Sequence, residues 1–207
     1  MAQRPFGSLH TIDKLDCLER YLKAYLKVFK NRPGIRTMYV DAFAGTGDIP
    51  TASSYDELPL GLEDQEFIVG SARRALALPE CFSEYVFIEK KRGNALALEK
   101  LRAANPEKNI QIKNADANFG LRQLCAERDW QKCRAVVFLD PFGSQVDWVT
   151  LEELGKTKAI DLWYLFPAGL SVHRQLGDGV VHYTHEGSLT RILGTPEWRT
   201  IVPRGVV

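Results

Sequence analysis

Apolar residues along the chain follow two alternating patterns. Short apolar runs alternate with segments in which apolar residues recur every three or four positions. The first pattern is typical of strands that are buried on both faces, and the second of amphipathic helices. Strands are expected at residues 37–40, 85–88, 109–113, 135–139 and 159–166, with helices between them at 70–78, 94–104, 119–127 and 148–154. This order predicts an α/β fold around a mostly parallel sheet.

A longer amphipathic helix is expected before the first strand. Thr11 can cap its start, and residues 31–34, with the sequence Asn-Arg-Pro-Gly, end it. The apolar face of this helix consists of Ile12, Leu15, Leu18, Tyr21, Leu22, Tyr25, Leu26 and Phe29.

The helix region is basic. Residues 1–36 carry eight basic and three acidic side chains. This excess, to which Lys23, Lys27 and Lys30 contribute, predicts either a solvated helix face or a surface that faces the phosphates of a nucleic acid.

Three segments follow from this pattern. Residues 1–35 are expected to form a helical extension and residues 36–167 the cofactor-binding core. Residues 168–207 show no clear strand or helix pattern. Inside the core, residues 48–66 carry six acidic and no basic side chains, together with prolines and a glycine, and are expected to form an irregular acidic loop.

Composition narrows the class of protein. The 207 residues are 45% hydrophobic and 26% charged, and the net charge of +1 excludes a polybasic nucleic-acid coat. No apolar run approaches the ~20 residues that a membrane span needs. The N-terminus also lacks the apolar stretch of a signal peptide. A cytoplasmic protein without a membrane partner is therefore expected.

Metal and disulfide sites are not expected. The four cysteines include no C-x-x-C pair, so reduced thiols are predicted. His173, His182 and His185 lack the spacing of metal ligands and are interpreted as solvated or packed side chains.

Four predicted strands are followed by an acidic residue. These residues are Asp41, Glu89, Asp116 and Asp140. Because the carboxyl ends of parallel strands line the binding crevice of such a sheet, the four carboxylates are expected to meet at one edge.

Two glycines follow the first strand. Gly45 and Gly47 allow a ligand to approach the backbone closely, although an ordinary turn explains them equally well. The third position of a dinucleotide fingerprint is occupied by Pro50, and an acidic loop follows. This acidic environment disfavours the binding of a diphosphate and suits a ligand with a positive centre and a small zwitterionic end.

Two of the carboxylates have a ligand interpretation and a structural one. Glu89 is placed to accept hydrogen bonds from both hydroxyls of a ribose, or it pairs with Lys90 or Lys91 at the surface. Asp116 could accept from the amino group of an adenine, or it caps the helix that follows, and both could hold together.

The sharpest motif is Asp140-Pro141-Phe142-Gly143. The Asp140 carboxylate and the Pro141 carbonyl supply two acceptors for a planar exocyclic amine, and Phe142 could stack on its ring. Such acceptors would orient the nitrogen lone pair toward an electrophilic methyl group. The alternative is a turn that ends the strand.

The ordered motifs resemble those of the Rossmann-like S-adenosylmethionine-dependent methyltransferases, and more narrowly those of the three-Cys-motif partner proteins. The segments that carry the likeness are Lys14-Leu15, Tyr21-Leu22, Tyr25, residues 39–47, Gly70-Ser71, Asp140-Pro141-Phe142-Gly143, Asp161-Leu162, Phe166-Pro167 and Arg174. The Asp-Pro-Phe-Gly string is also similar to a motif of tRNA guanine exocyclic-amine methyltransferases. The resemblance implies a three-layer α/β/α fold, for which seven strands are usual, so the five expected here indicate a shortened C-terminal part.

The resemblance also implies roles for residues. The cofactor-binding residues would be Asp41, Phe43, Gly45, Gly47, Glu89 and Asp116, with Glu89 at the ribose and Asp116 at the adenine. The residues that face the methyl acceptor would be Asp140, Pro141 and Phe142.

The expected activity is methyl transfer to an exocyclic amine, with a nucleobase, and hence a nucleic-acid substrate, as one candidate. The alternative is a non-catalytic protein that keeps the fold and acts in a complex with a three-cysteine-motif protein. A nicotinamide-dependent dehydrogenase is disfavoured, because Pro50 and the acidic loop do not suit the dinucleotide fingerprint.

Overall fold

A five-stranded parallel sheet forms the centre of the computed structural model, which describes residues 8–50, 67–168, 175 and 183–201. Its strands, in spatial order, are β5 (Ile110–Lys113), β4 (Glu84–Ile88), β1 (Arg36–Asp41), β6 (Cys133–Leu139) and β7 (Ile160–Tyr164). All four neighbouring pairs are parallel. Counted in chain order within this sheet, the strands lie as 3-2-1-4-5, the order of a doubly wound Rossmann-like fold. The predicted fold class and all five predicted strands are confirmed.

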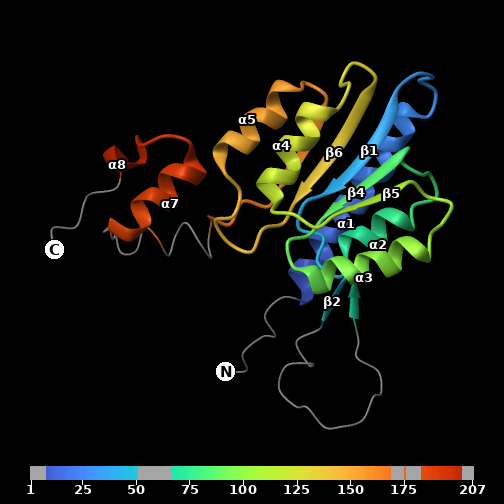
Figure 1. Ribbon diagram of the computed structural model, residues 1–207, viewed down its shortest axis with the longest axis horizontal. Helices are drawn as coiled ribbons and strands as arrows, with labels where there is room; N and C mark the ends of the chain where they lie inside the picture. Colours follow the sequence, from blue (N-terminus) through green and yellow to red (C-terminus); the bar gives the residue numbers. More distant parts are fainter. Residues whose placement is uncertain (1–7, 51–66, 169–174, 176–182, 202–207) are drawn as a thin grey trace, which may run out of the picture.

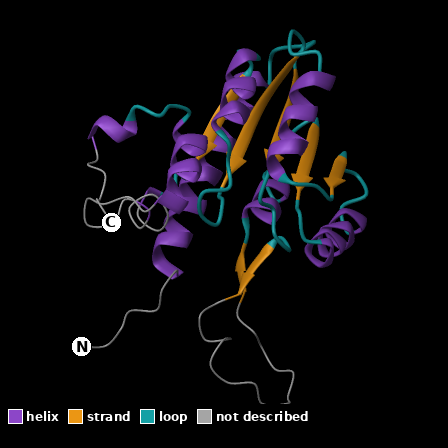
Figure 2. Cartoon of the chain, turned by 60° about the vertical axis from the view of Figure 1, so that its left-hand side comes forward, coloured by secondary structure: helices purple, strands orange, loops and turns teal. Residues whose placement is uncertain are grey.

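Helices cover both faces of the sheet (Figures 1 and 2). One face is covered by α1 (Ser8–Phe29), α2 (Ser71–Leu76) and α3 (Arg92–Ala103), and the other by α4 (Ala117–Glu127) and α5 (Trp148–Lys156). Because successive strand residues point to opposite faces, Tyr39 lies in the first core while Met38 and Val40 lie in the second. Burial on both faces explains why the three central strands, β1, β4 and β6, are largely apolar.

The first helix packs into the main core. Leu18 and Leu22 are buried among the side chains of the sheet, and the Tyr21 ring lies 5.0 Å from that of Trp163 in β7. The helix begins at Ser8, so Thr11 lies inside it, and the prediction that Thr11 caps the helix is wrong. The apolar pattern marks the packed part of a helix but not the polar turn that precedes it.

A short hairpin projects from the sheet (Figure 2). It pairs β2 (Asp48–Pro50) with β3 (Phe67–Val69) in antiparallel register. The prediction of irregular structure is therefore wrong for residues 48–50, whereas residues 51–66 of the predicted acidic loop lie outside the described residues. Each of these strands has three residues, and Pro50 is one of those of β2. Strands this short do not show the alternation of apolar and polar residues by which a strand is recognised in a sequence.

The described part of the C-terminal segment includes helices that the sequence pattern does not predict. They are α7 (Tyr183–Leu193) and α8 (Trp198–Ile201), and Leu189, Ile192 and Trp198 form a small core between them. The first half of α7 is polar and contains Gly187, which weakens the helical signal. His185 belongs to α7, and His173 and His182 lie outside the described residues.

In the part of the chain that the structure describes, no helix has the length and the apolar character needed to cross a membrane. Nor does this part of the chain gather three or more His, Cys, Asp or Glu side chains in an arrangement that could hold a metal ion. All four cysteines are free thiols.

Candidate functional site

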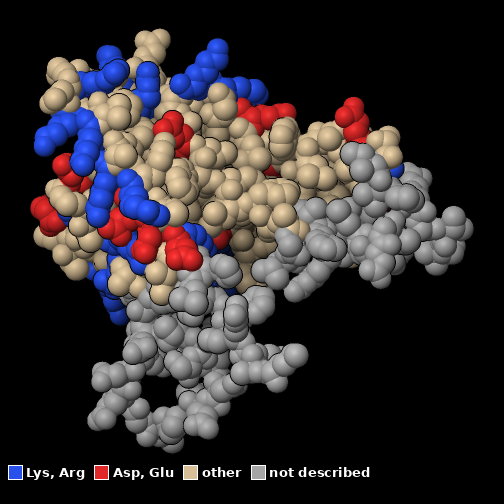
Figure 3. All heavy atoms as spheres, turned by 180° about the vertical axis from the view of Figure 1, so that it is seen from behind, with Lys and Arg blue, Asp and Glu red and all other residues tan. Residues whose placement is uncertain are grey.

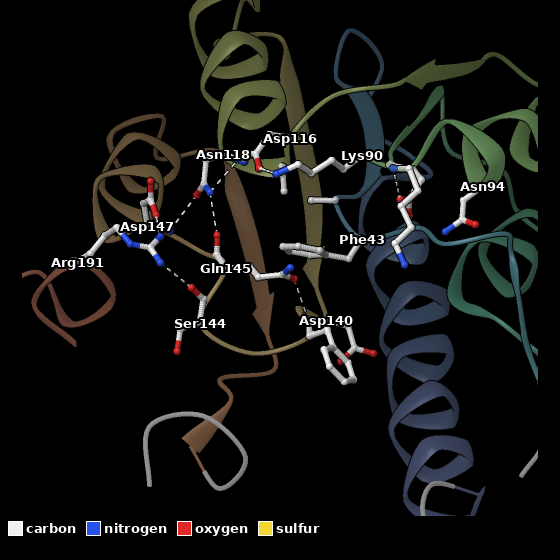
Figure 4. Close-up of a pocket in the computed structure, with 15 residues that line it drawn as sticks. Phe43, Lys90, Asn94, Asp116, Asn118, Asp140, Ser144, Gln145, Asp147 and Arg191 are labelled. Atoms are coloured by element: carbon white, nitrogen blue, oxygen red, sulfur yellow. Dashed lines mark hydrogen bonds and ion pairs between the residues drawn. The ribbon is translucent and has the colours of Figure 1, made fainter. Parts of the chain in front are cut away.

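A cavity of about 680 Å³ opens at the edge where the strands end. This edge contains the switch point of the sheet, between β1 and β6, where the chain changes from winding in one direction to winding in the other. The cavity is lined by residues that follow β1, β4, β5 and β6, with a contribution from α7 (Figure 4). Among the residues predicted from sequence, those that line it are Phe43, Glu89, Asp116, Asp140 and Phe142. The other predicted residues, Asp41, Gly45, Gly47 and Pro141, are not among its lining residues.

Asp41 lies beneath the cavity and is fully buried. Its carboxylate accepts hydrogen bonds from the Phe43 amide, at 3.2 Å, and from the Ser71 hydroxyl of α2. Burial raises the pKa of Asp41 to about 6, although these two hydrogen bonds act in the opposite direction. The nearby carboxylates of Asp140 and Glu89 raise the pKa further. Asp41 thus fixes the start of the turn after β1 from below.

Glu89 fixes the same turn from the side. Its carboxylate accepts hydrogen bonds from the amides of Gly45, at 3.0 Å, and Lys91, at 2.6 Å. The alternative of a surface pair with the Lys90 side chain does not hold, because the ammonium of Lys90 donates to Asp116 at 3.3 Å. Each carboxylate oxygen of Glu89 has a second lone pair that a ligand hydroxyl could use.

The helix-cap interpretation of Asp116 is confirmed. Its side chain accepts a hydrogen bond from the amide of Asn118, at 3.0 Å, at the start of α4. Partial burial acts to raise the pKa of Asp116, but the hydrogen bonds from Lys90 and Asn118 outweigh it and lower the pKa below its usual value. Asp116 is therefore a half-exposed, ionised carboxylate at the rim of the cavity.

Asp140 forms an ion pair with Lys14 of α1. The lysine ammonium contacts Oδ2 of the carboxylate, and none of the described residues donates to Oδ1. Phe142 is 94% exposed, so its ring is free to meet a ligand. The Pro141 carbonyl accepts from the Gly143 amide at 3.0 Å in a tight turn, and Gly143 itself has a left-handed φ of 92°.

Asn118, which the sequence analysis did not single out, connects the two sides of the cavity. Its amide nitrogen donates to the Gln145 carbonyl at 2.8 Å. Its side-chain oxygen accepts from the Asp147 amide and from the buried Thr150 hydroxyl, both at 2.9 Å. These contacts tie the start of α4 to the loop after β6 and to α5 (Figure 4). No local signal marks this role, because the partners lie 27 to 32 residues away along the chain.

Arg191 closes one end of the cavity. It extends from α7, forms an ion pair with Asp147 and donates to the Ser144 carbonyl at 2.8 Å. The sequence does not indicate a role for this residue, because it lies in the C-terminal segment, which shows no clear strand or helix pattern.

No family model matches the chain, and no curated protein matches it. The solved structures that it resembles include protein LPL1258 from Legionella pneumophila, of the family DUF519, at 19% identity and a TM-score of 0.44 over 60% of this chain and 53% of that one. The chain thus spans about half the length of LPL1258. A conserved hypothetical protein from Streptococcus pyogenes is 18% identical, with a TM-score of 0.39, over 66% of this chain and 69% of that one.

A further similar structure is YhhF from Escherichia coli, described as a candidate methyltransferase. It is 16% identical, with a TM-score of 0.34, over 70% of this chain and 62% of that one. Structural similarity at identities this low is evidence about the fold alone, so a proposal about function must rest on the residues of the site.

Proposed function

We propose that this protein is an S-adenosylmethionine-dependent methyltransferase that acts on an exocyclic amine, with a nucleobase as the candidate acceptor. One observation carries the proposal: Glu89, Asp116 and Asp140, which follow β4, β5 and β6, line one cavity beside the switch point of the sheet. Its volume of about 680 Å³ is within the usual range for sites that hold a small molecule.

The donor set fits this cofactor better than a dinucleotide. Four backbone amides of the turn after β1 donate hydrogen bonds within the protein. The Phe43 amide donates to the Asp41 carboxylate and the Gly45 amide to the Glu89 carboxylate. The Ala44 amide donates to the Ile88 carbonyl and the Gly47 amide to the Ala44 carbonyl. A diphosphate needs such amides as donors, usually at the start of a helix. Here the chain continues from the turn into β2, and carboxylates surround the turn. They suit the sulfonium centre and the ribose hydroxyls of S-adenosylmethionine.

Each residue then has a role. Glu89 would accept from the ribose hydroxyls and Asp116 from the adenine amino group. Bound S-adenosylmethionine supplies an electrophilic methyl group. The acceptor nitrogen would form its bond to that methyl as the sulfur–carbon bond breaks, and then release its proton to solvent. Asp140, through Oδ1, would accept an N–H of the acceptor and direct its lone pair, while Phe142 would stack on the ring.

Transfer of tritiated methyl groups to total cellular RNA, DNA and protein tests this proposal. We expect incorporation by the wild type and its loss in Asp140→Asn, because the amide presents donors where an acceptor is required. Cofactor affinity should persist in this variant. Asp129→Asn, which alters a carboxylate in the turn before β6, is the matched control and should keep the activity. Incorporation that survives Asp140→Asn would contradict the role of Asp140.

A second candidate function is that of a non-catalytic protein that acts in a complex, for which a three-cysteine-motif protein is the candidate partner. The ion pair between Lys14 and Asp140 favours it, because an ammonium already occupies part of the proposed acceptor site. A wild-type protein that binds S-adenosylmethionine but transfers no methyl group would support this second function over the first.

A further inference from the structure

The edge of the sheet opposite the cavity is strongly basic. Its part at β1, β6 and β7 is formed by three stretches of chain: residues 30–36, which lead from α1 into β1, residues 128–134, which lead from α4 into β6, and residues 156–158, which lead from α5 into β7. Together these contain eight basic side chains and one acidic one, a net charge of +7 in a chain whose net charge is +1. We call these three connections the basic edge.

The three connections lie side by side because β1, β6 and β7 are neighbours in the sheet. The Arg36 amide donates to the Lys132 carbonyl at 2.9 Å, and the Ala135 amide donates to the Ala159 carbonyl at 3.0 Å. Lys and Arg side chains gather along the upper margin of the molecule in Figure 3, the end at which the strands begin in Figure 2.

Part of this charge is neutralised within the protein. Glu84, at the start of β4, is buried and pairs with both Arg36 and Arg128. Lys156 pairs with Glu153 at 2.6 Å, and the ammonium of Lys30 lies 4.0 Å from the Glu80 carboxylate. These residues contribute little to an outside partner.

The other cations of the basic edge are not neutralised by a carboxylate of the described residues. Arg32, Lys132 and Lys158 are exposed, and none has a carboxylate partner among the described residues. The Arg134 guanidinium donates only to carbonyls, those of Trp130 at 2.9 Å and Cys133 at 2.7 Å. Lys158 also has a left-handed φ of 50°, a conformation that favours glycine or asparagine, so a lysine there suggests a use for its side chain.

The surroundings of these cations favour a polyanion over a folded protein. Protein interfaces rely on buried aromatic and aliphatic anchors, whereas binding to a phosphate backbone needs only exposed cations. Of the large apolar side chains that are exposed in the described part of the chain, only Val28 adjoins this edge.

We propose that the basic edge binds the phosphate backbone of a nucleic acid, at a surface separate from the cavity. Its binding residues are Arg32, Lys132, Arg134 and Lys158. Lys27, in the last turn of α1, adjoins this surface, and Lys30, directly after the helix, belongs to it, whereas Lys23 is paired with Glu19 at 2.7 Å.

Fluorescence anisotropy of a fluorescein-labelled RNA hairpin, titrated with the full chain at several NaCl concentrations, tests the proposal. A DNA hairpin of the same sequence shows whether the sugar matters. Phosphate contacts make log Kd depend linearly on log salt concentration. We expect the double variant Lys132→Gln/Lys158→Gln to reduce the size of that slope by about 2, or about 1 for each lysine. Its Kd at low salt should be about tenfold higher.

The matched control is Arg20→Gln/Arg92→Gln, which removes the same charge from other exposed positions and should keep the slope of the wild type. Equal losses in the two double variants would overturn the proposal, because net charge alone would then explain binding. So would the absence of binding to either hairpin at low salt, or equally tight binding of polyglutamate, which would indicate an acidic protein partner. Asp140→Asn should bind the hairpin normally, so this test is independent of methyl transfer.

Discussion

The two halves of the cavity are held in place by different kinds of contact. The half that would hold the cofactor, here called the cofactor half, contains Asp41, Glu89 and Asp116. Each of these carboxylates accepts a hydrogen bond from the backbone amide two residues further along the chain. In the acceptor half, the side chains are held by partners that are distant in the chain. Lys14 reaches Asp140 across 126 positions, and Arg191 reaches Asp147 across 44.

This difference separates a fixed half from an adjustable one. Amides that belong to the same turn as their carboxylate hold it without ordering a second long side chain. A half-exposed ion pair is weaker, because it must order two side chains and salt screens it. The cofactor half should therefore be preformed, whereas the acceptor half can change when α1 or α7 moves. The following changes test this contrast, from the largest expected effect to the smallest.

The largest effect is expected from Asp41→Asn in the cofactor half. Because the pKa of Asp41 is raised from 3.8 to about 6, the folded protein holds a proton that the unfolded chain releases between these values. The stability of the wild type relative to the variant should therefore fall by about 3 kcal/mol as the pH rises from about 3 to about 7. Urea denaturation across this range measures it.

Asp116→Asn is the control with the opposite sign. The pKa of Asp116 is lowered in the folded protein, so its contribution to stability is present at neutral pH and is lost as the pH falls. A stability difference between wild type and Asp41→Asn that did not change with pH would show that Asp41 is not held as described.

The next effect concerns the connection between the halves. Asn118→Ala removes the side-chain hydrogen bonds to Gln145, Asp147 and Thr150 and leaves the buried Thr150 hydroxyl without its acceptor. We expect a loss of about 2 kcal/mol in the free energy of unfolding. Thr150→Val removes only one of these bonds and should cost less. If the two variants were equally stable, Asn118 would not be the connecting residue.

The smallest effect is expected at the adjustable half. Arg191→Met removes the ion pair with Asp147 and should lower the stability by less than about 1 kcal/mol, with a smaller effect in high salt. Hydrogen exchange in α7 should become faster. Arg199→Met, which breaks a pair with Glu186 inside the C-terminal segment, should leave the loop that contains Asp147 unchanged. If the hydrogen-exchange protection of that loop fell in both variants, this result would contradict a specific role for Arg191.

The sequence predicted those parts of the structure that depend on neighbours in the chain. The central strands are evident in the sequence because burial on both faces makes them largely apolar, and the Asp116 cap is evident because its partner is two residues away. Lys14 was noted only as part of a motif, since nothing local shows that α1 brings it to Asp140. Asn118 and Arg191 were missed for the same reason. The hydrogen bond that the buried Asp41 accepts from Ser71 of α2 is not evident either, because the two residues lie 30 positions apart.

Calorimetric titration with S-adenosylmethionine, with NAD as the control ligand, tests the central claim most directly. The account predicts saturable binding of S-adenosylmethionine and none of NAD. Glu89→Gln should weaken this binding by about 1.5–3 kcal/mol, the value of a hydrogen bond to a charged group, whereas Glu99→Gln on α3 should not. Binding of NAD in place of S-adenosylmethionine, or an affinity that Glu89→Gln leaves unchanged, would contradict it.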